Sequence, residues 1–126
     1  METSRIVNIL GTEYIIDKRK YDEDENFEKN KYVAYIDTDI KNIVYLDMST
    51  HPELIASGAY KDSHKCESSE NATLRHEITH AFMYESGLGS CTLNAELPWS
   101  ENEEMIDWFA IQSPKIYKVF RELMLL

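Results

Sequence analysis

The segment His76-Glu77-Ile78-Thr79-His80 constrains this chain more than any other, because it places two imidazoles and a carboxylate on one short stretch of predicted helix. Histidines four residues apart project from the same helical face, about 6 Å apart along the axis, so both can reach one metal ion. Glu77 lies beside them and can approach a water molecule on that ion. That is the position a general base requires.

The same pattern also occurs by chance, in roughly one of a few hundred chains of this size, within an ordinary surface or core helix. The neighbouring residues argue against chance. They predict a buried helix, in which an unpaired polar pair would be costly unless a metal ion compensates it. These neighbours are apolar: Leu74, Ile78, Ala81, Phe82 and Met83.

A catalytic zinc site needs a third protein ligand and one open position, and Glu103 on the next predicted helix can supply that ligand. It follows His80 by 23 positions (103 − 80). Asp107 stands four residues further, on the same helical face. Glu103 can therefore bind the metal while Asp107 accepts a hydrogen bond from a ligand imidazole. Sites of this composition prefer zinc but also accept Co, Mn or Ni.

Two other interpretations of this acidic segment stay open. Ser100 and Glu103 have the spacing of a capping box, in which case Glu104 would be the ligand. The acidic residues from 101 to 104 are also typical of a solvated helix start that the macrodipole favours. We favour Glu103, because it stands in i, i+4 relation to Asp107.

Other polar residues carry weaker signals. Tyr84, four residues after His80, can line a cleft or donate to an oxyanion, but core packing is the better interpretation. His51 and His64 lie outside any ligand spacing and are interpreted as ordinary loop histidines. Cys66 and Cys91 are 25 positions apart (91 − 66), which favours free thiols in a reducing cytosol over a disulfide framework.

The first half of the chain favours strands. Ile6–Leu10 and Tyr14–Ile16 are β-branched or aromatic, and Tyr32–Asp37 with Ile43–Asp47 are predicted to form a hairpin. Between them, Lys18–Asn30 is nearly all polar, which predicts a loop or a weak helix.

The following segments favour helices. A short helix is predicted over Pro52–Ser57, ending at Gly58. Ser68 or Ser69 can cap the central helix, which runs to about Ser86 and stops at Gly87.

Another helix is predicted to start at Ser100 and to be interrupted by Pro114. Ser113 and Pro114 then suit the N-cap and first position of a final helix. Its apolar stripe is expected in the core and consists of Ile116, Val119, Phe120 and Leu123.

Length and charge narrow the class of protein. The 126 residues suit one domain, residues 1–126. A net charge of −10 argues against direct nucleic-acid binding, because it repels phosphate backbones. No apolar run approaches the roughly 20 residues that span a bilayer, and the N-terminus does not resemble a signal peptide. We therefore expect a cytoplasmic protein without a membrane partner.

Two blocks of the sequence resemble the ImmA/IrrE family of metallopeptidases, in particular its short phage or prophage members. The first runs from Leu74 to Phe82 and on through Glu85-Ser86-Gly87-Leu88. The second is Glu103-Glu104-Met105-Ile106-Asp107-Trp108-Phe109-Ala110. Together they cover only the C-terminal half of the chain.

The resemblance implies that the two histidines bind zinc, that Glu77 is catalytic, and that a glutamate seven positions before a Phe-Ala alanine completes the site. Counting back from Ala110 gives Glu103. The family often has Asn where this chain has Asp107. Family members with known roles cleave or inactivate DNA-binding repressors, and many such proteases bind an extended peptide against a sheet edge. By that analogy the hairpin ending near Asp47 is the candidate edge.

Together these observations predict an α+β, zincin-like domain of the gluzincin type, with a small N-terminal sheet or hairpin packed on the HExxH helix and C-terminal helices beyond it. The predicted function is zinc-dependent peptide hydrolysis, with Glu77 as general base and an intracellular protein or peptide, such as a repressor, as substrate. The alternative is a non-catalytic zinc-binding structural or interaction protein, in which zinc staples a degenerate peptidase fold.

Overall fold

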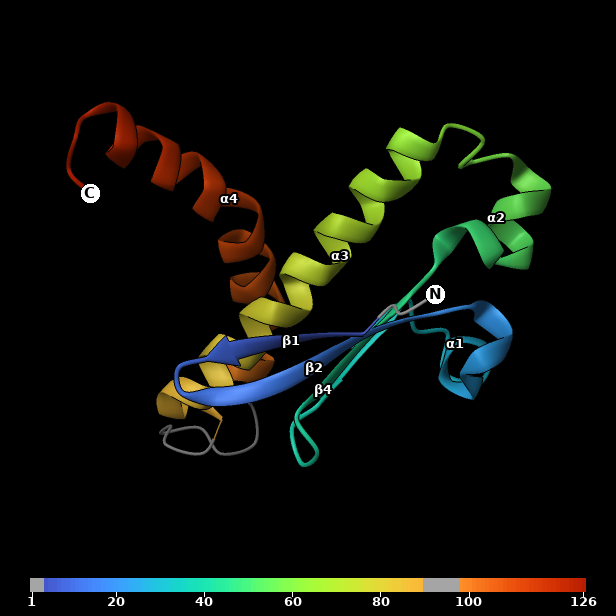
Figure 1. Ribbon diagram of the computed structural model, residues 1–126, viewed down its shortest axis with the longest axis horizontal. Coiled ribbons are helices and arrows are strands. Elements are labelled where there is room, and N and C mark those ends of the chain that lie inside the picture. Colours follow the sequence, from blue (N-terminus) through green and yellow to red (C-terminus); the bar gives the residue numbers. More distant parts are fainter. Residues whose placement is uncertain (1–3, 90–97) are drawn as a thin grey trace.

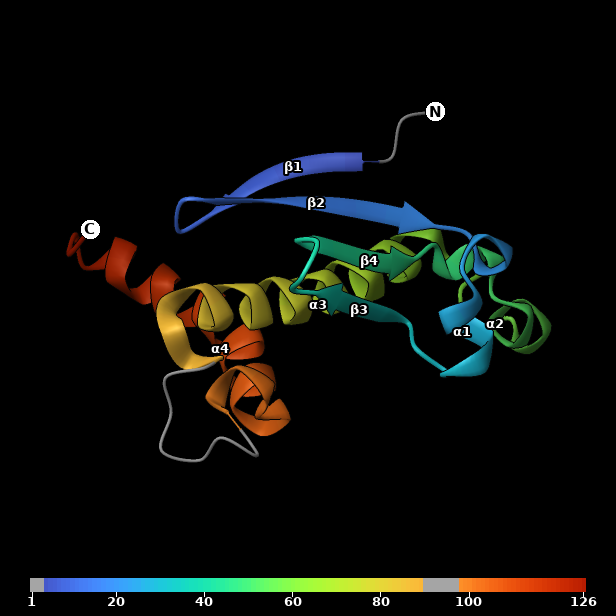
Figure 2. The same cartoon turned by 90° about the horizontal axis from the view of Figure 1, so that it is seen from below.

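The computed structural model describes residues 4–89 and 98–126, and its fold is α+β. A four-stranded sheet forms one layer, and the long helix α3 (Ser63–Met83) lies against one face of it, as Figures 1 and 2 show. The sequence therefore predicted the fold class and the helix-on-sheet arrangement. The strands are β1 (Ser4–Ile9), β2 (Thr12–Arg19), β3 (Ala34–Asp37) and β4 (Asn42–Leu46).

The strand order is β1-β2-β4-β3, with two antiparallel hairpins joined by a parallel β2–β4 pair. The predicted hairpin of Tyr32–Asp37 with Ile43–Asp47 is confirmed as the β3–β4 pair, and the strand-favouring runs Ile6–Leu10 and Tyr14–Ile16 lie mainly in the paired strands β1 and β2. The hairpin ending near Asp47 does lie at an edge of the sheet. Within it, β4 pairs with a strand on each side and all five of its residues are buried. The edge strand of this hairpin is β3. A strand rich in Ile, Val, Tyr and Leu suits such a central position, where both faces are covered.

A two-residue turn, Leu10-Gly11, closes the first hairpin, with Ile9 paired to Thr12. Both turn residues have positive φ, 52° at Leu10 and 94° at Gly11. This backbone twist matches the twist of the flanking strands, which is why two-residue hairpins use it. The Asn8 side chain accepts a hydrogen bond of 2.8 Å from the Gly11 amide and helps to hold the turn.

The polar segment after β2 contains a short helix, α1 (Glu25–Lys29), preceded by a 3-10 turn (Tyr21–Glu23). Asp24 caps α1 by accepting from the Asn26 amide. Its carboxylate also accepts hydrogen bonds from Arg19 and from the Tyr35 hydroxyl. Burial acts to raise the pKa of Asp24, but the hydrogen bonds from Tyr35, Asn26 and Arg19 outweigh it and lower that pKa. This buried cluster joins α1 to β2 and β3.

The short helix α2 has the expected bounds, Pro52–Ser57, and ends at Gly58 with a left-handed φ of 67°. His51 caps it, because its Nδ1 atom accepts from the Glu53 amide at 3.1 Å.

Helix α3 begins earlier than expected. Its N-cap is Asp62, which accepts from the His64 amide, so the prediction of Ser68 or Ser69 as the cap is wrong. The helix continues into a π-helical turn (Tyr84–Leu88) that contains Gly87 at φ 95°. Leu74 and Ala81 are buried as expected, whereas Phe82 is 41% exposed.

The end of α3 is anchored to the sheet by Glu85. Its Oε2 atom accepts a 2.8 Å hydrogen bond from the hydroxyl of Tyr14, a fully buried residue of β2. The Lys41 ammonium lies 3.2 Å from the same oxygen. These contacts fix the C-terminal part of α3, which carries the two histidines of the motif, against both hairpins.

Helix α4 (Glu103–Glu122) is continuous, and a 3-10 turn (Trp99–Glu101) precedes it. Its N-cap is Asn102, so the expected start at Ser100 is wrong, as is the interruption at Pro114, which lies within the helix. Ile106 and Ala110 are buried against α3. The apolar stripe expected in the core is exposed, because the second half of α4 points away from the rest of the molecule in Figure 1. Over the described residues, no helix is long and apolar enough to cross a membrane.

Candidate metal centre

The two motif histidines converge as their helical spacing requires. His76 and His80 lie one turn apart on α3, and their Nε2 atoms are 3.1 Å from each other. The rings meet edge to face with centroids 4.8 Å apart. Two imidazole nitrogens that point at the same place are a ready pair of metal ligands.

Glu103, the first residue of α4, completes this group. One carboxylate oxygen lies 3.0 Å from His76 Nε2 and the other lies 3.1 Å from His80 Nε2. The three potential ligand atoms lie within 4.8 Å of one another. Glu104 is not part of the cluster, because it lines a separate surface hollow with Met105 and Trp108. Of the two glutamates considered as third ligand, the structure brings Glu103 to the histidines.

A hydrogen bond to the far side of each ring fixes the orientation of the histidines. His76 Nδ1 lies 2.7 Å from Oδ1 of Asp107, the contact expected from the i, i+4 spacing with Glu103. His80 Nδ1 lies 2.5 Å from the backbone carbonyl of Ser100. Both acceptors require a proton on Nδ1, which leaves the Nε2 lone pairs directed at Glu103.

These residues fit a divalent metal such as zinc. Two imidazole nitrogens and one carboxylate form the donor set of catalytic zinc sites, and the outer hydrogen bonds set the tautomer that such a site requires. The His80 side chain is 11% exposed, whereas that of Glu103 is 65% exposed. One side of the cluster is therefore open to solvent, which leaves room for a water molecule or a substrate.

Glu77 is buried, with 8% of its surface exposed, and it lines the same cavity as His76 and Asp107. Burial raises the pKa of Glu77 above its ordinary value, and the adjacent His80 and His76 oppose that rise. A buried carboxyl with an elevated pKa beside a metal-ligand cluster is suited to accepting and returning a proton.

No family model, curated protein or solved structure matches this chain. The assignment of the site therefore depends on the geometry of its own residues.

Two cavities flank the cluster, one on either side. The first, about 340 Å³, extends from His76 and Glu77 to Val33 just before β3 and to Ala110 and Ile111 on α4. The second, about 140 Å³, lies beside His80 and is bounded by Ile36 and Thr38, Tyr84 and Ser100. Val33, directly before the edge strand β3, thus borders the first cavity and Ile36 of β3 borders the second, while His76 lines the first cavity and His80 the second.

The remaining candidates have other roles or lie elsewhere. Tyr84 borders the cavity beside His80, with the Lys41 ammonium 4.8 Å from its ring centroid. His51 caps α2, and His64 lies at the exposed start of α3, so neither joins the cluster. Cys66 is buried against β4, and Cys91 falls outside the described residues. Sequence reasoning missed the carbonyl of Ser100, since a backbone acceptor leaves no side-chain signal.

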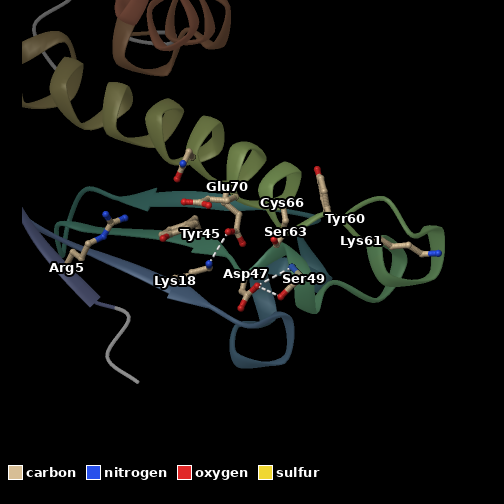
Figure 3. Close-up of a pocket in the computed structure, with 12 residues that line it drawn as sticks. Arg5, Lys18, Tyr45, Asp47, Ser49, Tyr60, Lys61, Ser63, Cys66 and Glu70 are labelled. Carbon is tan, nitrogen blue, oxygen red and sulfur yellow. Dashed lines mark hydrogen bonds and ion pairs between the residues drawn. The ribbon is translucent and has the colours of Figure 1, made fainter.

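A larger cavity of about 580 Å³ lies between the sheet and the N-terminal half of α3 (Figure 3). Its most buried charge, Glu70, accepts hydrogen bonds from Lys18 Nζ at 3.0 Å and from the Met48 amide at 2.9 Å. Those contacts already satisfy Glu70. Size alone therefore does not make this cavity the functional site.

Proposed function

We propose that this chain is a zinc-dependent metallopeptidase of the gluzincin type with a zincin-like fold, related to the ImmA/IrrE family. The observation that carries the proposal is the convergence of His76, His80 and Glu103, with Asp107 behind one imidazole and Glu77 in the adjoining cavity. A cluster of chance histidines would not be expected to have both outer ring nitrogens satisfied.

The roles of the residues follow from their positions. His76, His80 and Glu103 would hold zinc, which when bound polarises a scissile carbonyl and lowers the pKa of a coordinated water. Glu77 accepts the proton of the attacking water and passes it to the leaving amine. Asp107 and the Ser100 carbonyl keep the two imidazoles in the required tautomer and orientation.

The edge strand supports a peptide as substrate. The Val33 carbonyl accepts from the Leu46 amide, so the alternation of an antiparallel pair directs the backbone groups of Ala34 and Ile36 away from β4. An extended peptide can pair with these groups and place its side chains in the cavities on either side of the histidines. Its backbone would then cross the metal cluster. A DNA-binding repressor or another intracellular protein is the proposed source of that peptide.

The decisive experiment combines metal content with hydrolysis. Tag-free protein should contain close to one zinc per chain by elemental analysis, and His76→Ala and Glu103→Ala should lose it. Glu77→Gln should retain zinc but lose cleavage of a proteome-derived peptide mixture read by mass spectrometry. Glu67→Gln, an exposed site on the same helix, is the matched control. Full cleavage by Glu77→Gln would refute the mechanism.

Chelation separates this proposal from a structural zinc staple. Ile106 and Ala110 of α4 are buried against α3 through apolar contacts. Removal of zinc should therefore abolish hydrolysis and leave most of the fold, as measured by circular dichroism. Cooperative unfolding on chelation would instead favour a purely structural role for zinc.

A further inference from the structure

The second half of α4 has an apolar stripe that nothing in the described part of the chain covers. No residue from 111 to 126 is buried, although the helix continues to Glu122. Ile116, Val119 and Leu123 are 37%, 49% and 63% exposed, and Phe120 beside them is 42% exposed. An apolar stripe of this kind on a projecting helix marks an interaction surface.

The spacing of the stripe indicates what kind of surface it fits. Gln112, Ile116, Val119 and Leu123 follow one another at intervals of four, three and four residues. Residues with this spacing form one straight seam along a helix, and such a seam can pack against another helix. The seam lies on a different side of α4 from Ile106 and Ala110, which face α3. A second helix can therefore reach the seam without displacing α3.

The charges beside the seam favour an identical helix in antiparallel orientation. Lys115 and Glu122 directly precede Ile116 and Leu123, so they lie on the same flank of the seam, seven residues apart. When two copies run antiparallel, with Val119 opposite Ile116 of the other copy, Lys115 of each lies near Glu122 of the other. A two-fold axis thus creates this ion pair twice.

The remaining charges do not oppose this arrangement. Lys118 and Arg121 lie on the side of the helix away from the seam. Lys118 already pairs with Glu122 of its own chain at 3.3 Å. The Glu122 carboxylate would therefore lie between two ammonium groups, one from each copy.

We propose that the chain forms a two-fold symmetric dimer in which the seam Gln112–Leu123 packs antiparallel against the same seam of a second copy. The occupant of the exposed stripe is thus another molecule of this protein. The proposal does not depend on metal binding or catalysis, because these residues lie outside the metal cluster.

Sedimentation equilibrium of the full-length, zinc-supplemented protein tests the dimer. Wild type should approach twice the chain mass of 14.7 kDa as its concentration rises. Val119→Glu should remain at the mass of one chain and keep its helical circular dichroism, because Val119 is already exposed within one copy. Tyr117→Glu is the matched control, since Tyr117 is 53% exposed but lies off the seam, and it should still dimerise.

Charge reversal tests the register. Lys115→Glu alone and Glu122→Lys alone should each raise the dissociation constant about tenfold, and the double variant should return it close to the wild-type value. A monomeric wild type at all concentrations, an open polymer, or a monomer that binds anionic vesicles through this helix would overturn the proposal. Failure of the double variant to recover association would overturn the antiparallel register.

Discussion

The Nδ1 atom of His76 lies 2.7 Å from Oδ1 of Asp107, although the two residues are 31 positions apart in the sequence. This contact links the HExxH helix to α4 on the outer side of the candidate metal centre formed by His76, His80 and Glu103. On the inner side, Glu103 of the same helix faces both histidines. The start of α4 therefore provides both a candidate metal ligand, Glu103, and the carboxylate of Asp107, which orients a second candidate ligand, His76.

Asp107→Ala should weaken zinc binding by about 10- to 100-fold, because it frees the His76 ring to rotate and to change tautomer. Asp107→Asn should lose less zinc affinity, because the amide oxygen of asparagine can still accept a hydrogen bond from His76 Nδ1. Competition with a fluorescent zinc chelator measures the affinity. Glu104→Ala is the control, because Glu104 directly follows Glu103 but is not part of the candidate ligand group. This variant should bind zinc as tightly as wild type does. Equal loss in both alanine variants would contradict the orienting role.

Tyr14→Phe should lower the free energy of unfolding by about 1–3 kcal/mol, because it removes the hydroxyl that donates to the Glu85 carboxylate in a part-buried site. Urea denaturation followed by fluorescence gives this value. Tyr32→Phe serves as the control, as Tyr32 is 47% exposed. If both variants lost the same stability, the anchor between α3 and the hairpins would not be significant.

Leu10→Asn should stabilise the protein by up to about 1 kcal/mol, because Leu10 has a φ of 52° and asparagine adopts this left-handed region more readily. Thermal melts compare it with Ile40→Asn. Ile40 is 68% exposed, against 60% for Leu10, and lies in a turn with a φ that is not positive, so this second change should bring no gain. A stabilisation common to both variants would point to lost surface hydrophobicity instead.

Stability should fall as the solution is acidified below about pH 4, in part because of Asp24. The pKa of Asp24 is lower in the folded chain than in the unfolded one, so its contribution is complete above the unfolded pKa and is lost as the pH falls through the folded value. Urea midpoints between pH 3 and 7 should therefore change less steeply in Asp24→Asn than in wild type. Identical pH profiles would show that Asp24 does not contribute.

The sequence predicted elements whose signals are local. The bounds of α2 and the existence of the β3–β4 hairpin follow from turn residues and β-branched runs within a few positions of each other. The parallel pairing of β2 with β4 left no such signal, because it joins residues far apart along the chain. For that reason the strand order, in which β4 is internal and β3 lies at the edge, could not be predicted from the sequence.

The candidate metal centre was similarly predictable where helical spacing governs it. His76 and His80 share a face by periodicity, and so do Glu103 and Asp107. The Ser100 carbonyl and the Asn102 cap depend on how the chain enters α4, which the competing Ser100 capping pattern obscured. Helical periodicity also predicted the apolar stripe of α4. It could not predict what covers the stripe, since amphipathicity gives a face but not its partner.

The parallel pair in the centre of the sheet also bears on how quickly the chain folds. Each hairpin closes through contacts between neighbouring segments, such as Ile9 with Thr12, and can form early. Pairing Ile15 with Asn42 must instead close a long loop that contains α1 and β3. We therefore expect docking of the two hairpins to be the slow step of sheet assembly. Substitutions along the β2–β4 junction should consequently alter the refolding rate more than substitutions within either hairpin.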